Sequence, residues 1–254
     1  IQPIFSGGTS LSKGWGLIKR FSEDIDFKVI GNVERRVRRT YREQVITTLQ
    51  NSGFELQGEP IVRDSGNFFS VNFGYPSQFP IGPGLRPHLR VEMSFRPPAL
   101  PSIARPLRSI IGQALQTEIE VAEFPCVDPV ETAADKLSAL AWRVCTRQRG
   151  SKDDDATVIR HLHDLAALEQ LATESTQFTI LVLQAVAADS SRGGGNAPAA
   201  HADRFTAMLN LLETDVAWID EYDAYVHQVS FARSDEIIAF DQALAALKRL
   251  VGIV

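Results

Sequence analysis

The sequence of 254 residues carries a formal net charge of −5, with 44% hydrophobic and 22% charged residues. This length is sufficient for a substantial core, either as one large domain or as two lobes. No apolar run approaches about 18 residues and no basic, hydrophobic leader is present, so we expect a cytoplasmic protein without a membrane partner. The negative charge argues against indiscriminate nucleic-acid binding, but it does not exclude a local basic patch.

The segment 4–30 predicts a strand, a glycine turn, a helix and a second strand. The first apolar run ends at Gly7 and Gly8. Glycine takes positive φ and lets other groups approach the backbone closely. The amides of this pair, with the hydroxyls of Thr9 and Ser10 at a helix start, could hold phosphate oxygens. The turn therefore predicts a phosphate-binding site.

Asp24 and Asp26 lie two residues apart in the second predicted strand. Residues i and i+2 of a strand share one face, so both carboxylates should point the same way while Ile25 and Phe27 face the core. Two carboxylates held this close repel each other unless a cation lies between them. Mg²⁺ suits this position because it prefers carboxylates together with substrate phosphates. The alternative is a glycine turn beside a solvated acidic strand.

Residues 5–27, FSGGTSLSKGWGLIKRFSEDIDF, resemble the signature of the AbiEii/AbiGii toxin family of bacterial type IV toxin–antitoxin and abortive-infection systems. The resemblance implies a polymerase-β-like nucleotidyltransferase fold that binds a nucleoside triphosphate with Mg²⁺. In characterised members it implies transfer of nucleotides to tRNA acceptor ends, and it implies a cognate antitoxin. Similar proteins carry a helix upstream, so we expect that further residues precede Ile1.

The segment 34–51 predicts an amphipathic helix, because an apolar residue recurs at every fourth position. This stripe consists of Val37, Tyr41, Val45 and Leu49. Arginines flank it on both sides: Arg35, Arg36, Arg38, Arg39 and Arg42. Such a basic cluster in an acidic protein could contact RNA phosphates. The alternative is a solvated helix face without a ligand.

Short strands are predicted at residues 54–56, 68–73 and 89–95, where apolar and polar residues alternate. The stretch 74–88 contains four prolines and three glycines, a density that indicates a loop. A short helix is then expected near 103–114.

The strand at 89–95 is predicted to place Val91, Met93 and Phe95 on one face and Glu92 on the other. In nucleotidyltransferases of this general fold, a carboxylate from a later strand joins the paired acids. The resemblance suggests Glu92 for that position. The alternative is an exposed strand glutamate without a metal.

A further strand is expected at 117–124, and the chain is predicted to become predominantly helical from Pro129 onward. The stretch 190–200 is expected to be a flexible linker. Helices are expected at about 129–147, 159–171, 176–189, 201–229 and 235–251.

Lys136 lies in an apolar helical sequence, PVETAADKLSALAWR. A lysine there is either a surface residue with a snorkelling side chain or a buried cation directed at phosphate. The segment resembles a second signature of the family in which the lysine is functional, which favours the phosphate role. Arg143, two turns further on, could assist.

Residues 159–171, IRHLHDLAALEQL, resemble a third family signature, an Arg-x-x-x-Asp-Leu pattern that Arg160 and Asp164 match. The resemblance identifies Asp164 as the functional acid of this segment. It would orient either the acceptor or Lys136.

Other polar groups in this region are predicted to have structural roles. His161 and His163 are two apart on a helix and diverge, so we expect no zinc site. The acids at 153–155 are expected to cap a helix and to be solvated. Cys126 and Cys145 lack metal-ligand spacing and are expected to be small apolar core residues. Aromatic residues expected in the core or an interface are Trp218, Tyr222 and Tyr225.

These patterns predict an α/β (α+β) protein with a polymerase-β-like nucleotidyltransferase core, residues 1–125, and a C-terminal helical lobe, residues 126–254. The active site is expected in the cleft between them. We expect Mg²⁺ as cofactor, held by Asp24 and Asp26 with Glu92, and a nucleoside triphosphate as substrate.

Several groups of the predicted site are expected to bind the phosphates. Gly7, Gly8, Ser10 and Lys13 would hold the β and γ phosphates, and Lys136 would add a positive charge. The expected reaction is transfer of nucleotides to an RNA acceptor, the 3′ end of tRNA, which would inhibit translation and growth. The alternatives are nucleotidylation of a protein hydroxyl and a non-catalytic module that binds a nucleotide or an antitoxin.

Overall fold

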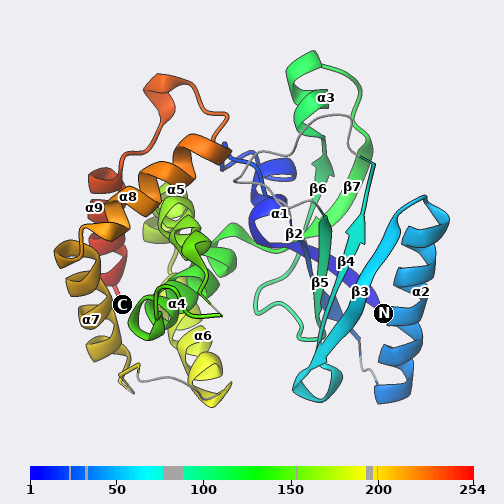
Figure 1. Ribbon diagram of the computed structural model, residues 1–254, viewed down its shortest axis with the longest axis horizontal. Helices are drawn as coiled ribbons and strands as arrows, with labels where there is room; N and C mark the ends of the chain where they lie inside the picture. The colour runs from blue at the N-terminus through cyan, green and yellow to red at the C-terminus, as the bar shows by residue number, and fades with distance from the viewer. Residues whose placement is uncertain (23, 32–33, 77–87, 153, 193–196, 199) are drawn as a thin grey trace. The chain divides into compact units, whose positions relative to one another are not determined.

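The computed structural model describes residues 1–254 except 23, 32–33, 77–87, 153, 193–196 and 199 (Figure 1). The chain forms two compact units, Ile1–Asp128 and Pro129–Val254. The first is a mixed α/β structure and the second is helical, which confirms the expected fold class. Most of the loop expected at 74–88, and part of the linker expected at 190–200, lie outside the described residues.

The first unit is built on a sheet of seven described strands in the order β3-β4-β5-β2-β1-β7-β6. The strands are β1 (Gln2–Ser6), β2 (Asp24–Ile30), β3 (Glu55–Arg63), β4 (Phe68–Gly74), β5 (Leu89–Ser94), β6 (Ile103–Leu107) and β7 (Val121–Cys126). The helices are α1 (Gly7–Lys13), α2 (Arg35–Asn51) and α3 (Ile110–Leu115), with a 3-10 turn at Asp64–Gly66.

The predicted order of strand, glycine turn, helix and strand at the start of the chain is confirmed. β1 and β2 are antiparallel neighbours, so the end of β1 lies beside the start of β2, with Ser6 opposite Asp26. β2 also pairs with β5 in parallel, and β5 pairs with β4 in antiparallel orientation. The acid-bearing strand β2 therefore lies in the interior of the sheet, between β1 and β5.

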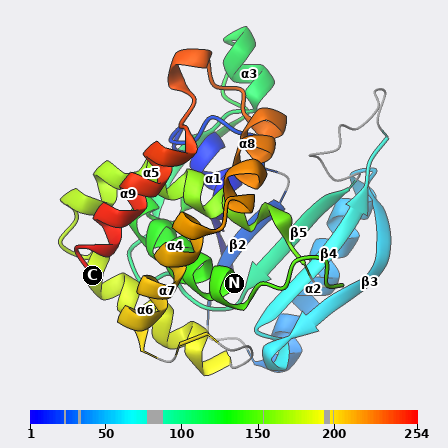
Figure 2. The same ribbon diagram turned by 60° about the vertical axis from the view of Figure 1, so that its left-hand side comes forward.

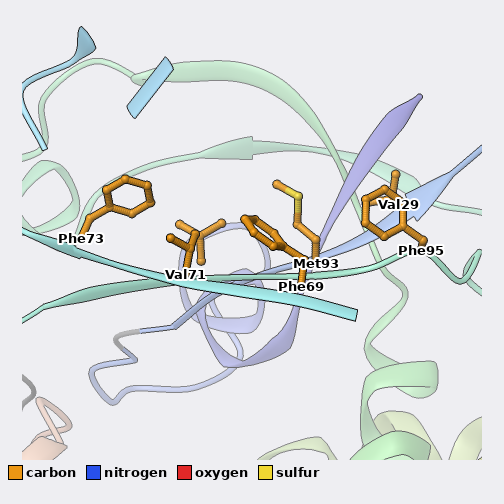
Figure 3. Close-up of a cluster of buried hydrophobic side chains, with 7 residues drawn as sticks. Val29, Phe69, Val71, Phe73, Met93 and Phe95 are labelled. Carbon is orange, nitrogen blue, oxygen red and sulfur yellow. The ribbon is translucent and has the colours of Figure 1, made fainter. Parts of the chain in front are cut away.

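An apolar cluster covers one face of β2, β4 and β5 and confirms the alternation predicted for β4 and β5. Figure 3 shows its side chains on the same side of the strands. Ile25 and Phe27 of β2 pack against this cluster, as predicted. The buried members are Val29, Phe69, Val71, Phe73, Val91, Met93 and Phe95.

Helix α2 packs on the apolar face through a stripe that differs from the predicted one. Tyr41, Val45, Ile46 and Leu49 contact the cluster, whereas Val37 is 44% exposed. Placing Val37 in the stripe was wrong because an exact spacing of four drifts around a helix that has 3.6 residues per turn. The first turn of α2 thus lies beyond the packed face.

The two outer strands of the sheet each contain a proline. β3 shifts register against β4 between Gln57 and Ile61, on either side of Pro60. β6 shifts register against β7 between Arg105 and Leu107, on either side of Pro106. Proline lacks the amide that a ladder requires, so it is tolerated at an edge and at an irregularity.

The helix predicted at 103–114 is wrong over its first half, which forms the edge strand β6. Pro106 disfavours a helix there because it removes a backbone donor, and the segment instead pairs with β7. Helix α3 begins only after Ser109, whose Oγ accepts a hydrogen bond of 2.9 Å from the Gly112 amide. The strand expected at 117–124 is confirmed only in its second half, because β7 begins at Val121.

The second unit consists of helices, shown from two directions in Figures 1 and 2. None of the described helices is long and apolar enough to cross a membrane. The helices are α4 (Pro129–Thr146), α5 (Arg160–Glu174), α6 (Phe178–Arg192), α7 (His201–Thr214), α8 (Ala217–Val229) and α9 (Phe240–Val251), with 3-10 turns at Ala156–Ile159 and Ser234–Glu236.

The single helix predicted at 201–229 is wrong, because α7 and α8 are separate. The backbone of Asp215 is extended, and its carboxylate accepts a hydrogen bond of 3.1 Å from the Ala217 amide. An aspartate that bonds the backbone two residues on offers the chain an alternative to a continuous helix.

An arginine network holds the segment that connects α4 to the following turn. Arg147 bonds Asp154 at 2.7 Å and Glu221 at 2.5 Å. Arg147 and Arg149 both contact the ring of Trp218, with guanidinium carbons 4.8 and 4.5 Å from its centroid. Trp218 is 2% exposed, so its predicted core position is confirmed.

Candidate functional site

The paired acids lie on the face of the sheet opposite the apolar cluster. Residues paired across neighbouring strands project to the same face, and β2 pairs Asp24 with Arg90 and Asp26 with Glu92. The predicted third acid is therefore the immediate neighbour of Asp26, although it lies 66 residues later in the chain. Like-charged neighbours favour a cation between them.

Ser70 positions the third acid. It pairs with Glu92 in the ladder between β4 and β5, and its Oγ donates a hydrogen bond of 3.2 Å to Glu92 Oε1. In the part of the chain that the structure describes, no three histidine, cysteine, aspartate or glutamate residues converge as a metal site. The structure thus places Asp24, Asp26 and Glu92 on one face without closing a three-acid cluster.

Gly7 makes room for the carboxylate of Asp26. Its φ is +69°, and a Cβ at this position would lie 2.0 Å from Asp26 Oδ2. A residue with a side chain would therefore displace the carboxylate and strain the backbone. The close approach leaves acid oxygens beside the first turn of α1, which is a donor set that fits Mg²⁺ with substrate phosphates.

Gly8 is required for close packing, whereas the predicted reason was a positive φ. It is not among the glycines with positive φ. A Cβ there would lie 2.9 Å from both Arg20 Nη2 and Ser22 Oγ. Gly8 therefore permits close packing of α1 on the segment that leads to β2.

The hydroxyl of Thr9 joins α1 to the acid strand. Thr9 Oγ1 donates a hydrogen bond of 2.5 Å to the backbone carbonyl of Asp24, and Thr9 is 2% exposed. Ser10 is equally buried, beside the thiol of Cys126. Both hydroxyls are thus almost fully buried in this structure.

Lys13, at the end of α1, is partly exposed. Burial lowers the pKa of its ammonium group, and the charge of Glu120 partly opposes this effect. Of the side chains predicted to hold phosphate on α1, Lys13 is the one with an accessible charge.

In the second unit, α4 and α5 bring Lys136 and Asp164 together. Lys136 Nζ lies 2.8 Å from Asp164 Oδ2, and the two side chains are 8% and 0% exposed. Lys136 is thus a buried cation with a carboxylate partner and does not snorkel to the surface. A buried charge that lost this partner would be strongly unfavourable.

The two histidines of α5 have different surroundings. His163 is buried with Nδ1 3.4 Å from Asp164 Oδ1. Both ring nitrogens of His161 are buried without a hydrogen-bond partner among the described residues, although the residue as a whole is partly exposed. Burial lowers the pKa of His161 well below its ordinary value, and the nearby Lys136 and Arg160 lower it further. His161 is therefore a neutral imidazole beside cations.

The lowered pKa of His161 makes the stability of the protein depend on pH. Below its ordinary value of 6.5, the unfolded chain binds a proton that the native state does not, so stability falls as the pH falls. We expect the free energy of unfolding to decrease by up to about 1.4 kcal/mol per pH unit from this group. Urea unfolding between pH 7.5 and 5.5 measures the decrease.

The variant His161→Asn is expected to reduce this pH dependence, and His227→Asn, at an exposed position of α8, serves as the control. An equal pH dependence in the wild type and in His161→Asn would contradict the assignment.

The remaining polar residues of this region bond one another. Arg143 and Arg160 each lie 3.4 Å from Asp155 Oδ2. Asp155 caps the turn that precedes α5, since its Oδ1 accepts a hydrogen bond of 3.0 Å from the Thr157 amide. This confirms a capping role for Asp155. Asp153, in the same acidic run, lies outside the described residues.

Sequence reasoning assigned no role in the site to three residues on the acid-bearing face: Ser70, Asn72 and Arg90. Arg90 Nε donates a hydrogen bond of 3.1 Å to Asn72 Oδ1. The alternation in FFSVNF and LRVEMSF already separated these residues from the apolar face. Their proximity to the acids depends on strand order, which the alternation does not reveal.

A glycine turn, a short helix, and a strand whose paired acids lie beside a third acid form the arrangement that the sequence analysis expected of a nucleotidyltransferase. The chain matches a family model described as "Nucleotidyl transferase AbiEii toxin, Type IV TA system" over residues 2–246. The chain belongs to this family, which confirms the resemblance seen in the sequence, and it is a nucleotidyltransferase.

The fold is similar to that of MenT4, a nucleotidyltransferase toxin from Mycobacterium tuberculosis H37Rv. The TM-score is 0.51 and the sequence identity is 19%, over 99% of this chain and 84% of that chain. No match was found among curated proteins.

Proposed function

We propose that this toxin transfers nucleotides from a nucleoside triphosphate to the 3′ end of tRNA in a Mg²⁺-dependent reaction, and that it thereby inhibits translation and growth. The observation that carries the proposal is the packing of Asp26 against Gly7, with Glu92 in the neighbouring register position. It places acid oxygens beside the first turn of α1, where a triphosphate and its metal can bind together. Both substrates are cytoplasmic, so we place the reaction there.

Asp24 and Asp26, with Glu92, would hold Mg²⁺. When bound, the ion neutralises triphosphate charge and lowers the pKa of an acceptor hydroxyl. The amides of Gly7 and Gly8, with the Lys13 ammonium, would bind the β and γ phosphates. Ser70 would keep the Glu92 carboxylate in place through its hydrogen bond.

Lys136 would stabilise the charge that develops on the departing pyrophosphate. A cation aimed at developing charge acts most strongly where water is excluded, and Lys136 is almost fully buried. Asp164 would hold the ammonium in one position through the 2.8 Å contact.

The test is the fate of label from each of the four α-labelled ribonucleoside triphosphates, incubated with total tRNA and a protein extract. Label on the tRNA 3′ end supports the proposal. Label on protein would identify the acceptor as a protein hydroxyl, and label on neither would show that the acceptor is a different molecule.

The basic helix α2 gives a further prediction about RNA. Arg38 donates a hydrogen bond to the Asn67 side chain and Arg42 donates one to the Gly66 carbonyl, so both hold the turn before β4. Arg35 and Arg36 are exposed. Replacing both by glutamine should weaken tRNA binding and reduce its log–log salt slope by about 0.7 to 0.9 per lost phosphate contact. Filter binding across a salt series measures the slope.

The matched control on the same helix replaces Arg38 and Arg42 by glutamine. This variant should lower the melting temperature, because it removes bonds that hold the turn. An unchanged salt slope in the Arg35 and Arg36 variant would assign these arginines to a solvated surface without a ligand.

A further inference from the structure

A row of polar residues extends from the acid pair across three further strands. The ladders pair Asp24 of β2 with Arg90 of β5, Arg90 with Asn72 of β4, and Asn72 with Gln57 of β3. Residues paired in this way project to the same face of a sheet. The row therefore runs along the acid-bearing face, away from β1 and α1.

The apolar side chains of β4 and β5 confirm which face the row occupies. Figure 3 shows Phe69, Val71 and Phe73 on one side of β4, and Asn72 lies between the last two in sequence. Because successive side chains of a strand alternate, Asn72 projects to the other side, together with its partner Arg90. No packing requirement of the apolar core explains an arginine there.

The guanidinium of Arg90 is oriented by a side-chain hydrogen bond. Its Nε donates a hydrogen bond of 3.1 Å to Asn72 Oδ1. Among the described residues, the guanidinium of Arg90 forms no ion pair. Arg90 and Asn72 are both partly exposed. Fixing Nε leaves the two terminal nitrogens as the fork of the guanidinium, whose geometry matches phosphate oxygens.

The order of the strands decides which substrate this fork faces. The acid strand β2 lies between β1, which leads into Gly7 and α1, and β5, which carries Arg90. If the triphosphate binds at α1, the β5 side of the acids is left for the second substrate. The reacting groups of two substrates must meet at the metal, so they approach it from opposite sides.

We propose that Arg90, positioned by Asn72, binds a backbone phosphate of the single-stranded RNA acceptor next to the nucleotide whose hydroxyl reacts. This rests on the proposed function of the same site. The amides of Asn72 and Gln57 continue the row with uncharged donors and acceptors, which suit the edges of unpaired bases. An unpaired strand can lie flat along such a row.

The direct test is equilibrium binding of a labelled twelve-nucleotide single-stranded RNA over a series of salt concentrations. Arg90→Gln removes the charge and keeps a side chain that can bond Asn72. It should weaken binding about tenfold at low salt, as expected for loss of one charge-assisted hydrogen bond. It should also reduce the log–log salt slope by about 0.7, the value for one phosphate contact on a single strand.

Two further variants make the test specific. Asn72→Asp keeps the shape of the row and places a carboxylate against Arg90, so it should reproduce the loss of slope without removing the arginine. Arg96→Gln is the matched control, because Arg96 is already paired with Asp64 at 2.7 Å and is not in the row. It should leave both affinity and slope unchanged.

Kinetics separate this inference from the proposed function. In nucleotidyl transfer to the same RNA, Arg90→Gln should raise KM for RNA about tenfold and leave KM for the nucleotide unchanged. If Arg90→Gln raises only KM for the nucleotide, or changes neither KM, Arg90 does not bind the RNA. The proposed transfer to RNA is unaffected by that result. If the wild type transfers no nucleotide but binds the RNA with an Arg90-dependent slope, the inference stands and the proposed reaction fails. A wild type that does not bind the RNA overturns both.

Discussion

Replacing Lys136 by alanine is expected to reduce single-turnover transfer to tRNA by roughly a hundredfold to a thousandfold, or about 2.7 to 4 kcal/mol, as is typical for loss of one donor to developing charge. Nucleotide affinity should fall far less, because only interactions that are stronger in the transition state accelerate the chemical step. Rapid-quench kinetics beside equilibrium binding of the nucleotide measure the two effects separately.

The ion pair with Asp164 complicates the single variant, because Asp164 is fully buried and would be left without its 2.8 Å partner. Removal of one member of a buried pair typically costs about 3 to 5 kcal/mol of stability. The double variant Lys136→Met with Asp164→Leu removes both charges and should regain much of that stability. A stable but inactive double variant supports the catalytic role, and an active one would make the pair purely structural.

The variant Asp26→Asn is expected to abolish the Mg²⁺-dependent part of triphosphate binding. The substitution keeps the shape of the side chain beside Gly7 but removes the negative charge that attracts the ion. Titration calorimetry with a non-hydrolysable triphosphate, with Mg²⁺ and with a chelator, measures this part of the binding.

Glu123→Gln on β7, at an exposed position, is the matched control and should bind like the wild type. Equal affinities for the wild type in Mg²⁺, the wild type in chelator and Asp26→Asn would contradict a metal site at these acids.

Local patterns predicted the elements that carry the acids, because alternation and glycine placement are short-range signals. The turn at Gly7, the strand of Asp24 and Asp26, and the inward face of β5 were all readable from a few consecutive residues. The segment 103–114 was not, since its strand pairing with β7 competes with helical spacing and is a tertiary effect.

The contacts within the candidate site depended on information that the sequence pattern does not contain. The pairing of Asp26 with Glu92 requires β2 and β5 to be neighbours, although four other elements intervene in the chain. The Thr9 hydroxyl resembled a phosphate ligand in sequence, but in the structure it bonds the Asp24 carbonyl. A hydroxyl near a helix start serves either purpose, and only the fold decides between them.

The prolines at the two outer strands have a consequence for how this chain behaves at high concentration. An unprotected edge is a template on which another copy of the chain can add a strand and begin to aggregate. In β3 and β6, Pro60 and Pro106 each remove a donor within the edge, and each coincides with a shift of register. A growing fibril requires an uninterrupted row of donors and acceptors, which neither edge offers. The chain therefore carries its own protection against self-association through the sheet, independently of any partner.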